Sequence, residues 1–194
     1  MQLINVKTNF LGQNYKFYEI IDSTQKEIWR LIEKNEIING QLVIADIQTA
    51  GVGTHGRIWH TDEVGNIAFS FYVETNCTAA DLDGVTIEIA EILVQIFKEK
   101  YNIKLEIKSP NDLIFNGKKI GGILTESKIS AEKVKFLVIG IGINIEKMNF
   151  SSDIKDIATS IKKEFNIDVD RQFIITEFCN KFEKTIIRRI SKWK

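Results

Sequence analysis

The chain has 194 residues, 44% of them hydrophobic and 27% charged, which is ordinary for a globular protein with one well-buried domain. Its 26 basic residues balance 26 acidic ones, so a general attraction to nucleic acid or to an anionic membrane is not indicated. No run approaches the roughly 18 apolar residues of a membrane span and no secretory signal pattern opens the sequence, so we expect a soluble, cytoplasmic protein.

The first half of the chain predicts three strands and one helix. The weak alternation of YKFYEI at 15–20 is typical of a strand. Thr24 and Glu27 then have the spacing of a capping box, which predicts that a helix begins here. The β-branched run LVIADIQ at 42–48 and the longer run NIAFSFYVE at 66–74 predict two buried strands.

The second half combines two helices with a β-rich middle. Apolar residues between 82 and 100 recur at helical spacing, and the same period returns between 170 and 192. Further strands are predicted at 104–108, 112–115 and 135–145. Asn116-Gly117 is a strong hairpin signal that leads into KKIGGILTES. Strand pairs joined by hairpins and interrupted by single helices predict an α+β fold with a mixed β-sheet flanked by helices.

Three glycines in six residues, GVGTHG at 51–56, match the spacing of a dinucleotide-binding loop. Such a loop needs a helix that begins at its third glycine, because the pyrophosphate lies at the amino terminus of that helix. Here Gly56 is followed by RIWHTDEVGN and then by the next predicted strand, which excludes that kind of site. No Gly-Lys-Ser or Gly-Lys-Thr ends the run, so a Walker loop is excluded as well.

The glycine loop remains suited to a nucleotide phosphate, with a plain surface connector as the alternative. Glycines let backbone N–H groups approach an anion, Arg57 adds a bidentate cation, and Trp59 offers a flat face for a base. In the segment KSPNDLIFNGKKIGG, Asp112 could bind Mg²⁺ and a lysine could neutralise a reacting phosphate. The alternative for the adjacent Lys118 and Lys119 is a solvated turn.

Six motifs occur in an order that is typical of one family. They are DST at 22–24, QTAGVGTHGRIW at 48–59, GNIAFSF at 65–71, KSPNDLIFNGKKIGGIL at 108–124, IGIGIN at 139–144 and ATS at 158–160. With them the sequence resembles the biotin–protein ligases, whose catalytic fold is shared with lipoate–protein ligases and related to class II aminoacyl-tRNA synthetases. The resemblance implies that biotin reacts with MgATP to give biotinyl-adenylate, and that a lysine of a biotin carboxyl carrier domain then takes the biotinyl group.

The resemblance also assigns roles to individual residues. The residues expected to hold biotin, at its ureido ring or along its tail, are Ser23, Thr24, Gln48 and Gly122. The residues expected at the nucleotide are Gly53, Gly56, Arg57, Trp59, Asn111 and Asn144. Arg57 and Lys119 are expected to meet the reacting carboxylate and phosphate, and Asp112 is the third expected catalytic residue and the magnesium ligand.

The sequence departs from the family pattern at three positions. The family loop usually reads GRGRxGR, and Val52 and Thr54 stand in place of its two inner arginines. Ser109 replaces the tryptophan of the family motif KWPND. A hydrogen bond from a charged group contributes about 1.5–3 kcal/mol, so a lost arginine could slow turnover or loosen the bound intermediate. We expect His55 to be a solvated loop residue.

Two alternatives to a biotin–protein ligase stay open. One is a ligase of the same fold for lipoate or another acyl acid, and the other is a non-catalytic protein that binds biotin or an acyl-adenylate. Retention of Arg57, Asp112 and Lys119 argues against the second. We expect residues 1–194 to form a single catalytic domain without a DNA-binding extension or a further C-terminal β-barrel module, and with neither nucleic acid nor a membrane as partner.

Overall fold

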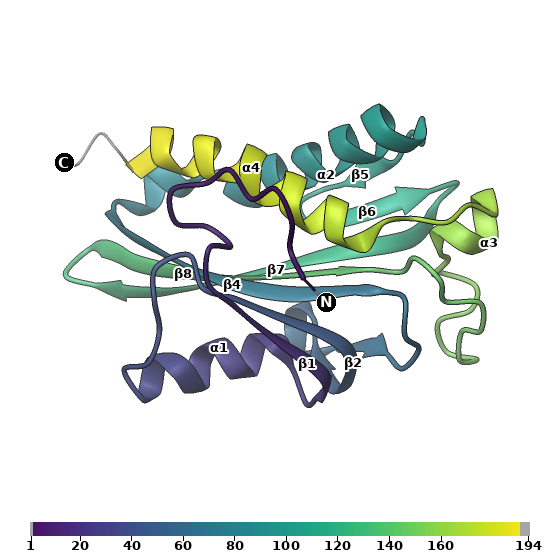
Figure 1. Cartoon of the computed structure of the whole chain (residues 1–194), viewed down its shortest axis with the longest axis horizontal. Helices are drawn as coiled ribbons and strands as arrows, with labels where there is room; N and C mark the ends of the chain where they lie inside the picture. The colour runs from purple at the N-terminus through teal and green to yellow at the C-terminus, as the bar shows by residue number, and fades with distance from the viewer. Residues whose placement is uncertain (1, 191–194) are drawn as a thin grey trace.

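The structure, a computed structural model, describes residues 2–190 and is built on one β-sheet with helices on both faces (Figure 1). Within these residues the strands are β1 (Tyr15–Ile21), β2 (Leu42–Val52), β3 (Ile58–Thr61), β4 (Ile67–Cys77), β5 (Glu106–Lys108), β6 (Asp112–Phe115), β7 (Lys118–Ser130) and β8 (Lys133–Ile143). They lie in the order β1-β2-β4-β8-β7-β6-β5, and β3 pairs with β2 beside this path. β1 is parallel to β2 and the other pairs are antiparallel, so the sheet is mixed, as predicted.

The helices are α1 (Thr24–Glu33), α2 (Val85–Tyr101), α3 (Ile161–Phe165) and α4 (Arg171–Ile190). In Figure 1, α1 covers one face of the sheet, and α2 and α4 lie together on the other. The helices predicted at 82–100 and 170–192 are confirmed as α2 and α4, although residues 191 and 192 lie outside the described part of the chain. None of the helices in the described part is both long enough and apolar enough to cross a membrane.

The central strands carry apolar side chains on both of their faces. Phe69 and Phe71 of β4 each have their ring centroid 5.7 Å from that of Phe178 on α4. The next residue, Tyr72, belongs to a smaller cluster with Ile28 of α1 on the opposite face. Because side chains alternate along a strand, a sheet that is covered on both faces requires the continuous apolar run seen in this segment.

The first turn of α1 differs from the predicted one. Ser23 is the N-cap, and its Oγ accepts a hydrogen bond from the backbone N–H of Lys26 at 3.4 Å. The predicted capping box between Thr24 and Glu27 is wrong, because Thr24 is already helical and its hydroxyl contacts Gln48 on β2. A tertiary contact, rather than a local cap, therefore uses the Thr24 side chain.

The hairpin predicted at Asn116-Gly117 is confirmed, since both residues have the positive φ values, 49° and 77°, that a tight two-residue turn requires. One extra residue, Ile120, stands in β7 between the pairs that Lys119 and Gly121 make with β6. Such a bulge changes the alternation of side chains along a strand. As a result Lys119 and Gly122 lie on the same face, the one that carries α1. Strand β3 and the short helix α3 were not predicted.

Candidate functional site

The face of the sheet that carries α1 also holds a hollow beside the amino terminus of that helix. Gly122 of β7 and Gly140 and Gly142 of β8 line it, and a side chain on any of the three would meet a neighbouring residue within about 3.1 Å. The isoleucines that alternate with the glycines in IGIGIN are buried in the core on the opposite face. This motif therefore builds the core and leaves room for a ligand at the same time.

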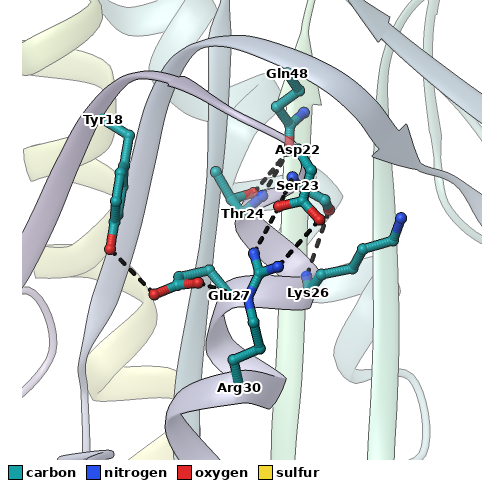
Figure 2. Close-up of polar contacts among 8 residues, drawn as sticks. All are labelled: Tyr18, Asp22, Ser23, Thr24, Lys26, Glu27, Arg30 and Gln48. Atoms are coloured by element: carbon teal, nitrogen blue, oxygen red, sulfur yellow. Dashed lines mark hydrogen bonds and ion pairs between the residues drawn. The ribbon is translucent and has the colours of Figure 1, made fainter.

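Hydrogen bonds join the first turn of α1 to the neighbouring strands at one end of this first hollow. Gln48 Oε1 accepts from the Thr24 backbone N–H at 2.8 Å and lies 3.1 Å from the Thr24 hydroxyl (Figure 2). Gln48 Nε2 donates to the Thr61 hydroxyl at 3.1 Å, and the hydroxyls of Thr24 and Ser70 lie 2.8 Å apart. These side chains, with that of Ser23, are almost completely buried. Because they are oriented by one another, this end of the hollow suits a ligand with several polar atoms.

A network of charged side chains holds the outer side of the α1 amino terminus in place (Figure 2). Arg30 Nη2 lies 2.6 Å from Asp22 Oδ1, and the same carboxylate accepts from the Ser23 backbone N–H at 2.8 Å. Arg30 also donates to Glu27 at 2.7 Å, and the Tyr18 hydroxyl donates to Glu27 at 3.1 Å. The hydrogen bond from Arg30 lowers the pKa of Asp22. The network thus fixes the turn that presents Ser23 to the hollow.

The indole of Trp59 on β3 borders both the first hollow and a second one. The ring packs so closely on Gly142 that a Cβ there would lie 2.3 Å from it. Lys119 Nζ lies 5.6 Å from the centroid of the same ring. Lys119, Gly53 and Thr54 also line both hollows, so a ligand that filled the two would pass Lys119 at their junction.

The second hollow combines cationic and apolar side chains. Besides the shared residues, its lining comprises Arg57, Ile58, His60, Asn144, Lys147, Phe150, Ile154, Ile157 and Ala158. The side chain of Lys147 is 2% exposed, pairs with Asp62 and has its ammonium 5.7 Å from the centroid of the Phe150 ring. Asn144 Nδ2 donates to the Thr159 carbonyl at 3.1 Å, which ties the strand end to the ATS motif. Cations beside apolar side chains suit a ligand with an anionic part and a flat ring.

Lys119 contacts Asp112 across the hairpin of β6 and β7, with Nζ 2.6 Å from Oδ1. No donor among the described residues makes a well-aligned hydrogen bond to this buried oxygen, so the contact with the ammonium is mainly electrostatic. Asn111 lines the first hollow and donates from Nδ2 to the Ile123 carbonyl at 3.1 Å. Lys118 lines neither hollow. Of the two adjacent lysines, the one expected at the reacting groups, Lys119, is therefore the one beside the hollows.

Asp112 is the one predicted metal ligand. Mg²⁺ prefers six oxygen ligands and is commonly held by one or two carboxylates together with phosphates and water. Within residues 2–190 no group of three or more His, Cys, Asp or Glu side chains could hold a metal ion by itself. The buried Oδ1 of Asp112, which has no well-aligned hydrogen bond, offers a single carboxylate oxygen beside Lys119. These residues fit a magnesium ion that arrives with the phosphates of a nucleotide.

The glycine loop forms a single 3₁₀ turn between β2 and β3, and no helix begins at Gly56, which agrees with the exclusion of a dinucleotide loop. The Arg57 guanidinium donates to the Thr54 carbonyl at 3.2 Å and to its hydroxyl at 3.0 Å. His55 is exposed, as predicted. Gly56 lines neither hollow, in contrast to Gly53 and Arg57. Gly56 is thus the one predicted nucleotide-binding residue that lines neither hollow.

The lining residues that were not predicted include three buried polar or charged ones, Gln25, Ser70 and Lys147. Ser70 carries a usable signal, because it is a polar residue inside the apolar strand NIAFSFYVE and faces the same way as the tyrosine two positions on. Gln25 directly follows the DST motif but has no spacing of its own. Nothing in the sequence around Lys147 distinguishes it from a surface lysine.

Residues 17–144 match the model of the biotin/lipoate A/B protein ligase family. The bifunctional ligase/repressor BirA of Bacillus subtilis is 36% identical over 181 residues, which cover 92% of this chain and 55% of that protein. The biotin–protein ligase of Homo sapiens is 27% identical over 194 residues, which cover 94% of this chain and 26% of that protein. The chain therefore spans about half the length of the Bacillus relative and a smaller share of the human one.

Solved structures give the same comparison in three dimensions. The biotin protein ligase from Aquifex aeolicus in complex with biotin and ATP has a TM-score of 0.72 and 30% identity, and the match covers 94% of this chain and 72% of that one. The ligase from Leishmania major in complex with biotin has a TM-score of 0.69 and 26% identity, with coverages of 93% and 81%. These similarities confirm the predicted fold class.

Proposed function

The chain belongs to the biotin/lipoate A/B protein ligase family, and we propose that it is an ATP-dependent biotin–protein ligase. In this proposal it activates biotin as biotinyl-5'-adenylate and transfers the biotinyl group to a lysine of a biotin carboxyl carrier protein or domain. The names of the relatives and the complexes of the similar structures with biotin and with ATP support this choice.

The observation that carries the proposal is the junction of the two hollows at Lys119 and Trp59. The first hollow has a buried polar end at Ser23 and runs past Gly122, which suits a polar ring with an aliphatic tail. The second has cations and apolar side chains, which suit a nucleotide. A tail carboxylate and a phosphate would then meet beside the Lys119 ammonium.

This arrangement meets the electrostatic demand of the reaction. A carboxylate oxygen must attack the α-phosphate while the bond to the β-phosphate breaks, and both reactants are anions. Lys119 supplies positive charge at the junction of the hollows, and Arg57 supplies it at the edge of that junction. Such charge stabilises a transition state most effectively when it is already oriented. Magnesium, held by the phosphates with Asp112, would shield the departing pyrophosphate. In the second step a lysine amine of the acceptor attacks the acyl carbon and AMP leaves.

A lipoate ligase of the same fold is the second candidate, favoured by the departures at Val52, Thr54 and Ser109. Val52 and Thr54 both line the first hollow, so they can affect ligand choice. One observation argues against lipoate: the dithiolane ring offers no hydrogen-bond partner to the polar end of the first hollow at Thr24 and Gln48. A site built for hydrogen bonding strongly disfavours ligands that lack the matching groups. We therefore place biotin first, and a cytoplasmic carrier protein as its acceptor.

Calorimetry with biotin and with lipoate tests the ligand, and mass spectrometry of the protein incubated with MgATP and either acid tests the activation step. We expect biotin to bind, lipoate to bind at least about tenfold more weakly, and biotinyl-adenylate to form. Transfer to a purified biotin carboxyl carrier domain is the final readout. Binding of lipoate alone would establish the second candidate, and biotin binding without adenylate would indicate a non-catalytic protein.

Restoring an arginine at position 54 is expected to slow release of the bound adenylate. Thr54 lines both hollows, and a charge-assisted hydrogen bond to the phosphate corresponds to about 10- to 100-fold in release rate. Free adenylate trapped with hydroxylamine measures the release. Thr54→Met is the matched control, because it adds length without charge and also removes the hydroxyl that accepts from Arg57. Equal release from the native protein and Thr54→Arg would show that another residue anchors the loop.

A further inference from the structure

Gln25, the second residue of α1, lines the first hollow and is 4% exposed. Its amide nitrogen Nε2 donates to Glu126 Oε2 on β7 at 2.8 Å and to the Val138 carbonyl on β8 at 3.2 Å. The same Glu126 oxygen accepts from Trp29 Nε1 at 2.7 Å. Two strands of the sheet thus hold the Gln25 amide at two points, and Trp29 of α1 holds the Glu126 carboxylate.

These contacts determine which way the Gln25 amide faces. A carboxylate oxygen and a backbone carbonyl can only accept, so the atom between Glu126 and Val138 must be the NH₂ group. The carbonyl oxygen Oε1 then points away from both. It is buried, and no donor among the described residues bonds to it. A buried carbonyl oxygen without a partner is uncommon in folded proteins and requires an explanation.

The free oxygen lies at the floor of the hollow. A Cβ placed on Gly140 would be 2.7 Å from Gln25 Oε1 and 3.2 Å from Ser70 Oγ, and both Gly140 and Ser70 line the same hollow. The neighbouring acceptor differs in this respect, since Gln48 Oε1 already receives the Thr24 N–H and lies within reach of its hydroxyl. Gln25 therefore offers an acceptor that the protein itself does not use.

We propose that Gln25 Oε1 accepts a hydrogen bond from a ring N–H of the bound acyl acid, and that Gln25 thereby selects a cyclic urea over rings that carry no N–H. This inference rests on the proposed function, because it takes biotin as the ligand. The polar end of the hollow supplies hydroxyls at Ser23 and Ser70 for the urea, while Gln25 supplies an acceptor of fixed direction. A dithiolane ring would leave Oε1 unbonded, which adds to the discrimination against lipoate.

Glu126 and Trp29 act through Gln25 as positioning residues. Without the Glu126 carboxylate, Nε2 would keep only its longer bond to Val138, and the amide could rotate so that NH₂ faces the hollow. A donor in that place would oppose a ring N–H. The effect of Glu126 on ligand affinity should therefore depend on the presence of Gln25.

The test is calorimetry with Gln25→Met, which keeps the length of the side chain and removes its acceptor. The ligands are biotin and two cyclic carbamate analogues, in each of which one ring N–H is replaced by oxygen. We expect Gln25→Met to weaken biotin binding about 10- to 100-fold and to change binding of one of the analogues by less than about twofold. Gln95→Met on the exposed side of α2 is the matched control and should bind all three ligands like the native protein.

A double-mutant cycle tests the positioning role. Glu126→Ala should weaken biotin binding in the native background but cause little further loss in Gln25→Met. If Gln25→Met does not fold, Glu126→Ala with the three ligands carries the test, and an equal loss for all three overturns the inference. If the native protein binds biotin and Gln25→Met binds it equally well, the inference is wrong and the proposed function stands. If the native protein does not bind biotin, both are wrong.

Discussion

Replacing Lys119 with alanine is expected to slow adenylate formation by about 100- to 1,000-fold, the range seen when one preorganised group that stabilises developing charge is removed. Lys119 lines both hollows, and its ammonium is held by Asp112 at 2.6 Å and by the face of Trp59. It is therefore already in place where a carboxylate and a phosphate would meet. Pyrophosphate release in a single turnover, with biotin and MgATP in excess over their dissociation constants, measures the step.

Lys118→Ala is the matched control, because it removes the same charge one residue earlier from a side chain that lines neither hollow. Its effect should be less than about threefold, since a partly exposed charge outside both hollows contributes little. Equal losses from the two variants would contradict the assignment. Lys119→Ala also leaves Asp112 unpaired, and Asp112 is itself the proposed magnesium ligand, so Lys119→Ala combined with Asp112→Asn is compared with Asp112→Asn alone. Recovery of the rate in the double variant to that of Asp112→Asn would attribute the loss to the stranded carboxylate.

Most of the fold was predictable from local patterns. The helical period between 82 and 100 and the apolar run at 66–74 each reflect burial on one or both faces, and both elements are found. Strand β3 was not predicted because IWHT at 58–61 is short and half exposed, and only its pairing with β2 makes it a strand. Helix α3 has five residues, fewer than periodicity can detect. The capping box failed because Thr24 is used by a strand 24 residues away.

The residues of the candidate site also fall into those that local sequence patterns identify and those that they do not. Residues that sit inside motifs, such as Gln48 and Lys119, line the hollows, and their roles there stay predictions. Gln25 and Lys147 depend on partners that are distant in the sequence, since Gln25 meets Glu126 over 101 residues and Lys147 meets Asp62 over 85. A single sequence carries no signal for such pairs. Their geometry follows from the register of the sheet, which only the folded structure provides.

Glu183→Ala is expected to lower the free energy of unfolding by about 3–5 kcal/mol. The Glu183 carboxylate on α4 is 4% exposed and accepts three backbone N–H groups, from Asn9 at 2.6 Å and from Phe10 and Leu11 at 2.9 Å each. In Figure 1 the N-terminal segment crosses α4. Alanine would leave these donors to water or unpaired, and Leu11, which is fully buried, would lose its anchor. Urea denaturation measures the change.

Two further substitutions determine how much of that loss comes from the hydrogen bonds. Glu183→Gln keeps one acceptor oxygen, which can serve either Asn9 or the pair Phe10 and Leu11 but not both, so about half of the loss is expected. Glu177→Ala on the same helix removes a more exposed carboxylate, 3.8 Å from Lys181, and should cost less than about 1 kcal/mol. Similar stabilities for all three variants would mean that the N-terminal segment is held by its apolar contacts. Because α4 and the hollows lie on opposite faces of the sheet, each variant should bind biotin with unchanged affinity under conditions in which it is folded.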